Sequence, residues 1–199
     1  MQEKVSMPQQ IILASSSVYR QNLLKQIQLP YLVALPRIQE REHHHENPSE
    51  LARNLALLKA ESVAHHYPND LIIGADQVAV LGKTMMPKPM TYESAVAQLQ
   101  QVSGKTVYFH SGIALHHPAR QVTHTDVVIT KVTFRTLNAA LIHRYLQKEH
   151  VLNCGCSLKS EGLGIALLQA VESCDPTALV GLPLIRLCDF LIQEGYPVP

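Results

Sequence analysis

Apolar and polar positions alternate along the chain in blocks that predict strands and helices in turn. Short or β-rich apolar runs predict strands, which lie at residues 10–14, 31–35, 71–80, 106–115, 122–134 and 164–171. The segments 106–115 and 122–134 resemble an antiparallel pair, with Gly112 or Pro118 marking a bend. The pattern contains no internal repeat and no linker.

Apolar residues at helical spacing predict helices between the strands, at residues 20–27, 49–66, 91–99, 136–145 and 182–194. Ser49, Thr91 and Thr136 are interpreted as N-caps, and Gly195 with Pro197 ends the last helix. The polar segment 36–48 is predicted to be a loop. This order of elements predicts an α/β protein with a mixed, twisted sheet flanked by helices.

Composition narrows the class of protein. The 199 residues are 46% apolar and 17% charged, so we expect a folded protein, with one domain spanning residues 1–199. Lys and Arg (17) nearly balance Asp and Glu (16), which does not favour nucleic-acid binding. No apolar run is long enough for a membrane span, and the N-terminus lacks a signal-peptide core. We interpret the four cysteines as reduced thiols and expect a cytoplasmic protein.

Asp76 interrupts the most apolar predicted strand, residues 71–80. An unpaired buried carboxylate costs several kcal/mol, on the order of the desolvation penalty for a charge. The residue is therefore expected to have a partner, a metal or a chemical role. A strand-end Asp that caps a neighbouring amide is the structural alternative, and this segment alone leaves both open.

Four other junctions carry charge beside loops. Residues 15–20, Ser-Ser-Ser-Val-Tyr-Arg, form either an anion cradle at a helix start or an ordinary N-cap. Lys59 interrupts an apolar run, so it either extends to solvent or reaches a buried anion. Lys88 stands between two prolines, and residues 159–164 carry Lys, Ser and Glu before two glycines.

Familiar catalytic motifs are absent from the sequence. It has no phosphate loop of the G-x-x-x-x-G-K-[ST] type, no dinucleotide fingerprint, no nucleophile elbow and no H-E-x-x-H zinc helix. The run at residues 43–45 is three histidines, which either bind a metal or lie in a solvated loop.

Taken in order, these junctions resemble the Maf family of nucleoside triphosphate pyrophosphatases over nearly the whole chain. The family motif S-x-S-P-x-R corresponds to residues 15–20, D-[TQ]-V to residues 76–78 and G-K-P to residues 87–89. L-S-G corresponds to residues 102–104, and the closing V-G-L-P is intact at residues 180–183. The resemblance implies a Maf/inosine-triphosphatase-like fold with two lobes around a central cleft.

One branch of the family, the 7-methyl-GTP pyrophosphatases, carries an aromatic residue, Gln and Glu at three positions. This chain has Tyr19, Gln77 and Glu161 there, so it resembles that branch. The physical logic agrees, because an aromatic face over a cationic 7-methylguanine adds about 0.5 to 2 kcal/mol. A carboxylate also accepts from the guanine N1–H and amine while offsetting the ring charge.

The resemblance further implies roles for the other residues. Asp76 is the expected base that activates water, and Asp76 and Glu40 are the expected ligands of a divalent cation, Mg²⁺ or Mn²⁺. The implied substrate-binding set is Ser15, Ser17, Tyr19, Arg20, Lys59, Gln77, Lys88, Lys159 and Glu161. The expected partner is a small-molecule nucleotide, with neither nucleic acid nor membrane, and a homodimer is a family-level expectation.

The chain departs from the family pattern at several positions. Val18 replaces the motif proline, Gln39 replaces the first residue of an acidic pair, and Pro87 replaces a glycine. Tyr19 stands where the branch has Trp, and Gly155-Cys156 replaces Ala-Gly. Two alternatives stay open: a pyrophosphatase for another nucleotide, such as a pyrimidine triphosphate, and a nucleotide-binding cell-division regulator with little turnover.

Overall fold

The computed structural model describes residues 10–39 and 47–198. Its strands are β1 (Ile11–Ala14), β2 (Tyr31–Ala34), β3 (Leu71–Leu81), β4 (Thr84–Met85), β5 (Thr106–His117), β6 (Val122–Phe134) and β7 (Leu168–Glu172). They form one seven-stranded sheet in the order β2-β1-β3-β5-β6-β7, with β4 paired to β3. β1 runs parallel to β2 and β3, and the other pairs are antiparallel. The predicted mixed sheet is confirmed.

The α-helices are α1 (Val18–Leu24), α2 (Pro48–Glu61), α3 (Tyr92–Val102), α4 (Ala139–Lys148) and α5 (Leu184–Gln193). Short 3₁₀ turns are η1 (Lys25–Ile27), η3 (Ala64–His66), η4 (Gly155–Ser157), η5 (Leu163–Leu167) and η6 (Ala178–Val180). They connect or extend the longer elements, so the helix predicted over residues 49–66 is α2 followed, after a break, by η3.

Two predicted helix caps are wrong and one is confirmed. The Asn47 side chain accepts from the Ser49 amide, and Asn138 accepts from Leu141, so these asparagines cap α2 and α4 in place of Ser49 and Thr136. Asn competes well for this position because its short side chain reaches the orphan amides of the first turn. Thr91 caps α3 by accepting from the Ser94 amide, as predicted.

The strand prediction is wrong at residues 164–167 and incomplete after β3. Residues 163–167 form η5, and the extended backbone of β7 begins only at Leu168. The apolar run continues through both elements, so the sequence pattern does not mark the boundary between them. β4 was not predicted, since its two residues carry no periodic signal. Pro118 lies in the turn between β5 and β6, whereas Gly112 lies within β5.

Helix α2 packs directly on the sheet over two glycines. A Cβ atom added at Gly74 would meet the Ala56 carbonyl oxygen, and one added at Gly112 would meet the Ala52 carbonyl oxygen. Both obstructing atoms belong to the helix backbone, which cannot move without shifting all of α2. These glycines therefore fix how closely α2 approaches β3 and β5.

Gly74→Ala is expected to destabilise the fold by about 1 to 3 kcal/mol, the usual cost of overpacking a close-packed interior. The measurement is the denaturation midpoint at an unchanged slope against denaturant. Gly155→Ala is the matched control, because its nearest neighbour to an added Cβ is the Met86 oxygen at 3.9 Å. Equal stability of the two variants would contradict this packing argument.

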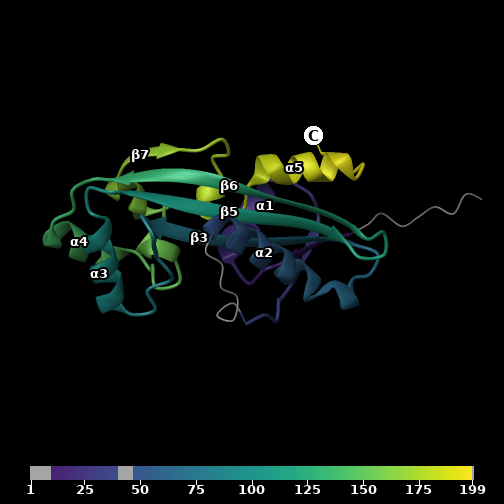
Figure 1. The fold of residues 1–199 in the computed structure, drawn as a ribbon, viewed down its shortest axis with the longest axis horizontal. Coiled ribbons are helices and arrows are strands. Elements are labelled where there is room, and N and C mark those ends of the chain that lie inside the picture. Colours follow the sequence, from purple (N-terminus) through teal and green to yellow (C-terminus); the bar gives the residue numbers. More distant parts are fainter. Residues whose placement is uncertain (1–9, 40–46, 199) are drawn as a thin grey trace, which may run out of the picture.

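Two large hydrophobic cores lie toward opposite ends of the long strands (Figure 1). One core joins α3 and α4 to the sheet, and the other joins α1 and α5 to β1, β3 and β5. At the second end α2 covers the opposite face, where its Ala60 packs with Ile12 and Ile72. This arrangement matches the predicted two lobes. Within the described residues, no helix is long and apolar enough to cross a membrane.

Candidate active site

The site begins at a gap along one edge of β3. The pairing of β1 with β3 ends where Ala14 lies opposite Gly74, and the pairing of β4 begins at Val80. Over the described chain, no strand pairs with β3 on this side between those points. The chain leaves β1 at Ser15 and turns into α1 there, so β3 residues 76–79 line a pocket instead of a strand partner.

Asp76 faces α2 and forms a buried ion pair with Lys59. The Lys59 Nζ lies 2.6 Å from the Asp76 Oδ1, and each residue is only 7% exposed. Side chains alternate along a strand, so Asp76 lies on the same face as Gly74, over which α2 makes its close approach. Of the two alternatives for Lys59, the structure shows the second: it reaches a buried anion. Of the three possibilities expected for Asp76, namely a partner, a metal or a chemical role, the structure shows a partner.

The segment after β1 forms a compact turn held by its own hydroxyls. Ser15 Oγ accepts from the Ser17 amide at 3.1 Å and from Arg20 Nη1 at 3.5 Å, while Ser17 Oγ accepts from the Arg20 amide at 3.4 Å. Arg20 Nε also donates to the Gly181 carbonyl at 2.8 Å. Ser15 is buried and orders this turn, whereas Ser16, Ser17 and Arg20 line the pocket.

Gln77 faces the opposite side of β3 from Asp76 and bonds to the two residues directly before the closing V-G-L-P motif. Its Nε2 lies within hydrogen-bond distance of Ser111 Oγ (2.9 Å) and of the Ala178 and Leu179 carbonyls (both 3.0 Å). Residues 179–181 thereby form another wall of the pocket. Gln77 also lines the pocket, but its amide group is bonded to the protein, and a contact with substrate stays a prediction.

Lys88 projects from a segment fixed at several backbone points. The Met86 amide donates to Ala79, the Met86 carbonyl accepts from Cys156, and Gln98 Nε2 donates to the Pro87 carbonyl at 2.8 Å. Lys88 itself is exposed and lines the pocket. These bonds at Met86 and Pro87 hold the backbone directly before Lys88 in place, although Pro87 replaces the family's glycine.

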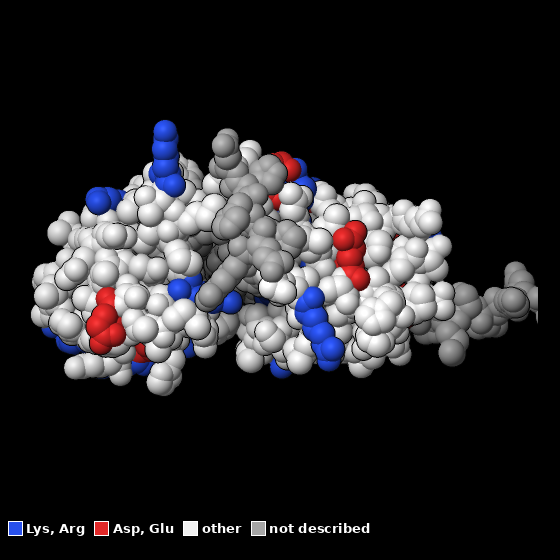
Figure 2. Space-filling model, turned by 60° about the horizontal axis from the view of Figure 1, so that its bottom comes forward, with Lys and Arg blue, Asp and Glu red and all other residues white. Residues whose placement is uncertain are grey.

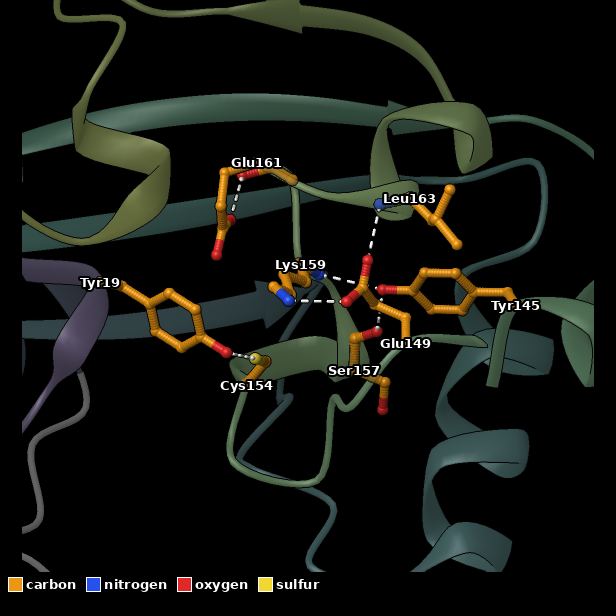
Figure 3. Close-up of polar contacts among 9 residues, drawn as sticks. Tyr19, Tyr145, Glu149, Cys154, Ser157, Lys159, Glu161 and Leu163 are labelled. Atoms are coloured by element: carbon orange, nitrogen blue, oxygen red, sulfur yellow. Dashed lines mark hydrogen bonds and ion pairs between the residues drawn. The ribbon is translucent and has the colours of Figure 1, made fainter. Parts of the chain in front are cut away.

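Tyr19 and Glu161 line the same pocket near the 154–163 segment (Figure 3). The Tyr19 hydroxyl lies 3.9 Å from the Cys154 sulfur, and the Lys159 Nζ lies 5.9 Å from the centre of the Tyr19 ring. Burial, and then Cys154, raise the pKa of the Tyr19 phenol, so it stays neutral at physiological pH. Glu161 is exposed, with the Ser160 hydroxyl 3.5 Å from its Oε2.

The pocket has a volume of about 1150 Å³, enough for a nucleotide. Its charged lining residues in the described chain are Arg20, Lys59, Asp76, Lys88 and Glu161. Figure 2 shows basic side chains at a hollow near the middle of this face. Excess cationic charge in a cleft favours an anionic ligand.

The structure thus brings most of the predicted site residues together. Ser15 and Lys159 lie just outside the lining, and Lys159 is ion-paired to Glu149. Glu40 and the histidines at 43–45 lie outside the described residues, so the structure says nothing of them. Cys154, Met86 and Ser16 line the pocket without having been predicted. Only Ser16 had a signal, because it lies within the first motif.

The residues present fit a magnesium-type cation held largely through phosphate oxygens. Mg²⁺ is usually bound by one or two carboxylates together with substrate phosphates and water. Asp76 supplies one carboxylate among cationic side chains. No cluster of three or more His, Cys, Asp or Glu residues suited to a metal occurs in residues 10–39 and 47–198. Asp76 would hold such a cation together with phosphate oxygens of the substrate.

Comparison with solved structures defines the class of fold. A HAM1 protein from Coxiella burnetii matches with a TM-score of 0.56 and 14% identity, covering 93% of this chain and 99% of that one. The Ham1 protein of Staphylococcus aureus matches with a TM-score of 0.53 and 16% identity, covering 94% and 100%. At these identities the likeness concerns the fold, and the predicted fold class is confirmed.

The sequence comparisons identify the family. The family profile described as Maf-like protein matches residues 10–194, and the chain belongs to the Maf family. A 7-methyl-GTP pyrophosphatase of Pseudomonas putida is 47% identical over 95% of this chain and 98% of its own. A protein of the same name from Methylobacillus flagellatus is 47% identical and covers 94% of this chain and 98% of its own length. The one from Pseudomonas aeruginosa is 46% identical and covers 95% of this chain and 98% of its own length.

Proposed function

We propose that this protein hydrolyses 7-methyl-GTP to 7-methyl-GMP and diphosphate, with a divalent cation. The observation that carries the proposal is one pocket that holds both the buried Asp76–Lys59 pair and the two base-reading candidates, Tyr19 and Glu161. The relatives that share nearly half of this sequence bear the name of that activity.

The cationic side chains are suited to bind the triphosphate. Arg20, Lys59 and Lys88 enter the pocket from α1, from α2 and from the segment after β4. Positive charge placed beside oxygens that become more negative in the transition state stabilises the transition state more than the ground state, and so lowers the barrier. A bound Mg²⁺ or Mn²⁺ would add neutralisation and orient the phosphates.

Asp76 is the proposed general base. A water molecule attacks the α-phosphorus, its proton passes to an Asp76 oxygen, and the bond to the bridging oxygen breaks to release diphosphate. Lys59 holds the carboxylate in one place through its 2.6 Å contact.

Tyr19 and Glu161 are the proposed readers of the base. A 7-methylguanine carries a positive charge that guanine lacks, so a neutral aromatic face and a carboxylate both favour the methylated base. Both groups line the pocket, and the Lys159 Nζ lies 5.9 Å from the centre of the Tyr19 ring.

The direct test is diphosphate release from a panel of triphosphates: 7-methyl-GTP, GTP, dTTP and UTP. Each is assayed with Mg²⁺, with Mn²⁺ and with a chelator. We expect the highest kcat/KM for 7-methyl-GTP and loss of turnover in the chelator. A preference for a pyrimidine triphosphate would contradict the proposed substrate, and binding without turnover would favour a regulatory role.

Lys88→Ala is expected to weaken binding of a triphosphate more than binding of 7-methyl-GMP. The loss for an uncleavable triphosphate analogue should be about tenfold, which corresponds to ~1.4 kcal/mol. The reason is that an exposed cation on a fixed backbone can serve the outer phosphates, which the monophosphate lacks. Lys83→Ala is the control, because this exposed lysine lies in the turn before β4 and outside the pocket lining. Equal losses for both ligands, measured by calorimetry, would place Lys88 away from the leaving phosphates.

A further inference from the structure

The segment that carries Glu161 is bound at both ends by one carboxylate (Figure 3). Glu149 directly follows α4, and its Oε1 accepts from Lys159 Nζ at 2.6 Å. Its Oε2 accepts from the Leu163 amide at 2.7 Å. Lys159 and Leu163 lie two residues before and two residues after Glu161, so Glu149 joins the two ends of this short loop.

The fit between this loop and Glu149 is close. A Cβ atom added at Gly162 would collide with the Glu149 carboxylate. Tyr145, one turn earlier on α4, accepts from the Lys159 amide at 3.0 Å and donates to the Ser157 carbonyl at 3.2 Å. The Lys159 backbone is thus fixed independently of Glu149, which leaves the Lys159 side chain as the part whose placement depends on the carboxylate.

Lys159 brings a positive charge next to the proposed base-reading groups. Its Nζ lies 5.9 Å from the centre of the Tyr19 ring, and Glu161 is two residues away. The side chain of Glu149 is only 11% exposed and that of Lys159 is 25% exposed, so solvent screens this pair incompletely. The hydrogen bond to Glu149 raises the pKa of Lys159, and the same bond lowers the pKa of Glu149, so both are charged at neutral pH.

A charge in this position matters for one class of ligand in particular. A cation near the pocket repels 7-methylguanine but has little effect on neutral guanine, because the two bases differ by one positive charge. An unpaired Lys159 can also turn to Glu161 and occupy the carboxylate that the base requires. Glu149 opposes both effects by holding the ammonium group at 2.6 Å.

We propose that Glu149 is a specificity-determining positioning residue, which neutralises Lys159 and so keeps Tyr19 and Glu161 available to a cationic purine base. Glu149 acts through Lys159 and does not itself line the pocket. The inference rests on the proposed function, because it assigns the residue that maintains the preference for a methylated base.

The test measures the ratio of affinities for 7-methyl-GMP and GMP by calorimetry in four proteins at low ionic strength. These are the wild type, Glu149→Gln, Lys159→Met and the double variant. Glu149→Gln should lower the preference for 7-methyl-GMP by about three- to tenfold, the effect of one incompletely screened charge. Lys159→Met should raise it, and the double variant should return to within about twofold of the wild type if the two charges cancel. Glu172→Gln is the control, since it breaks the exposed pair with Lys131 on β6 and β7.

Two outcomes would overturn the inference: an unchanged ratio in Glu149→Gln, or a double variant that loses as much preference as Glu149→Gln alone. The second outcome would mean that Glu149 only holds the loop. If Glu149→Gln fails to fold, the rise in Lys159→Met still decides, because a structural role for the pair predicts a fall or no change. Failure of the proposed function is seen separately, as a wild type that does not prefer 7-methyl-GTP over GTP in turnover.

Discussion

Asp76→Asn is expected to lower kcat by about 10²- to 10⁴-fold, the usual range for loss of a general base. Binding of 7-methyl-GMP should be largely retained. The physical reason is that the amide keeps the size of the side chain but cannot take a proton from water. The measurement is steady-state diphosphate release together with calorimetry of the product. A variant with near-normal kcat would make Asp76 structural and remove the central assignment.

The substitution also leaves Lys59 buried without its carboxylate. Breaking a buried pair by removing one partner costs about 3 to 5 kcal/mol, so stability must be measured alongside activity. Asp76→Glu separates the two effects, because it keeps the charge near Lys59 but moves the carboxylate by one methylene group. We expect this variant to stay folded and still lose most activity. Asp126→Asn is the matched control, since it removes a half-buried ion pair with Arg186 that lies outside the pocket lining.

Most of the fold was predictable because its signals are local. The apolar runs at β1, β2 and β3 and the long β-rich segments of β5 and β6 each predict a strand from the residues of that segment alone. The caps at Asn47 and Asn138 were assigned to neighbouring hydroxyl residues, because several residues that can cap lie within a few positions of each helix start. Only the backbone geometry decides among them. β4 is too short to carry any pattern.

The site was predictable as a set of residues but not as an arrangement. The resemblance to the family implies that Asp76, Arg20, Lys88 and Glu161 belong to one site, and the structure places all four in the lining of one pocket. The contacts between elements were beyond the sequence, since Lys59 and Asp76 meet only because α2 approaches the sheet over Gly74 and Gly112. The contacts of Glu149 could not be predicted either, because this residue lies outside the motifs and bonds to Lys159 and Leu163, which lie ten and fourteen residues later in the chain.

Glu161→Gln combined with Tyr19→Arg is expected to shift preference away from 7-methyl-GTP. Losing a charge-assisted contact with the base costs about 1.5 to 3 kcal/mol. Loss of the aromatic face adds about 0.5 to 2 kcal/mol, and an arginine there repels the cationic ring. The measurement is the ratio of kcat/KM for 7-methyl-GTP over GTP and over UTP in the wild type and the double variant.

Turnover of GTP distinguishes a loss of base recognition from damage to the phosphate site. It should change much less than turnover of 7-methyl-GTP, because both substitutions leave Asp76, Lys59 and Lys88 intact. Glu161→Gln alone isolates the carboxylate, and Tyr19→Phe is the control that keeps the ring while removing its hydroxyl contact with Cys154. An unchanged ratio in the double variant would mean that neither residue reads the base. The substrate would then have to be recognised by other walls of the pocket, such as residues 179–181, where the Leu179 carbonyl accepts from Gln77 and the Gly181 carbonyl accepts from Arg20.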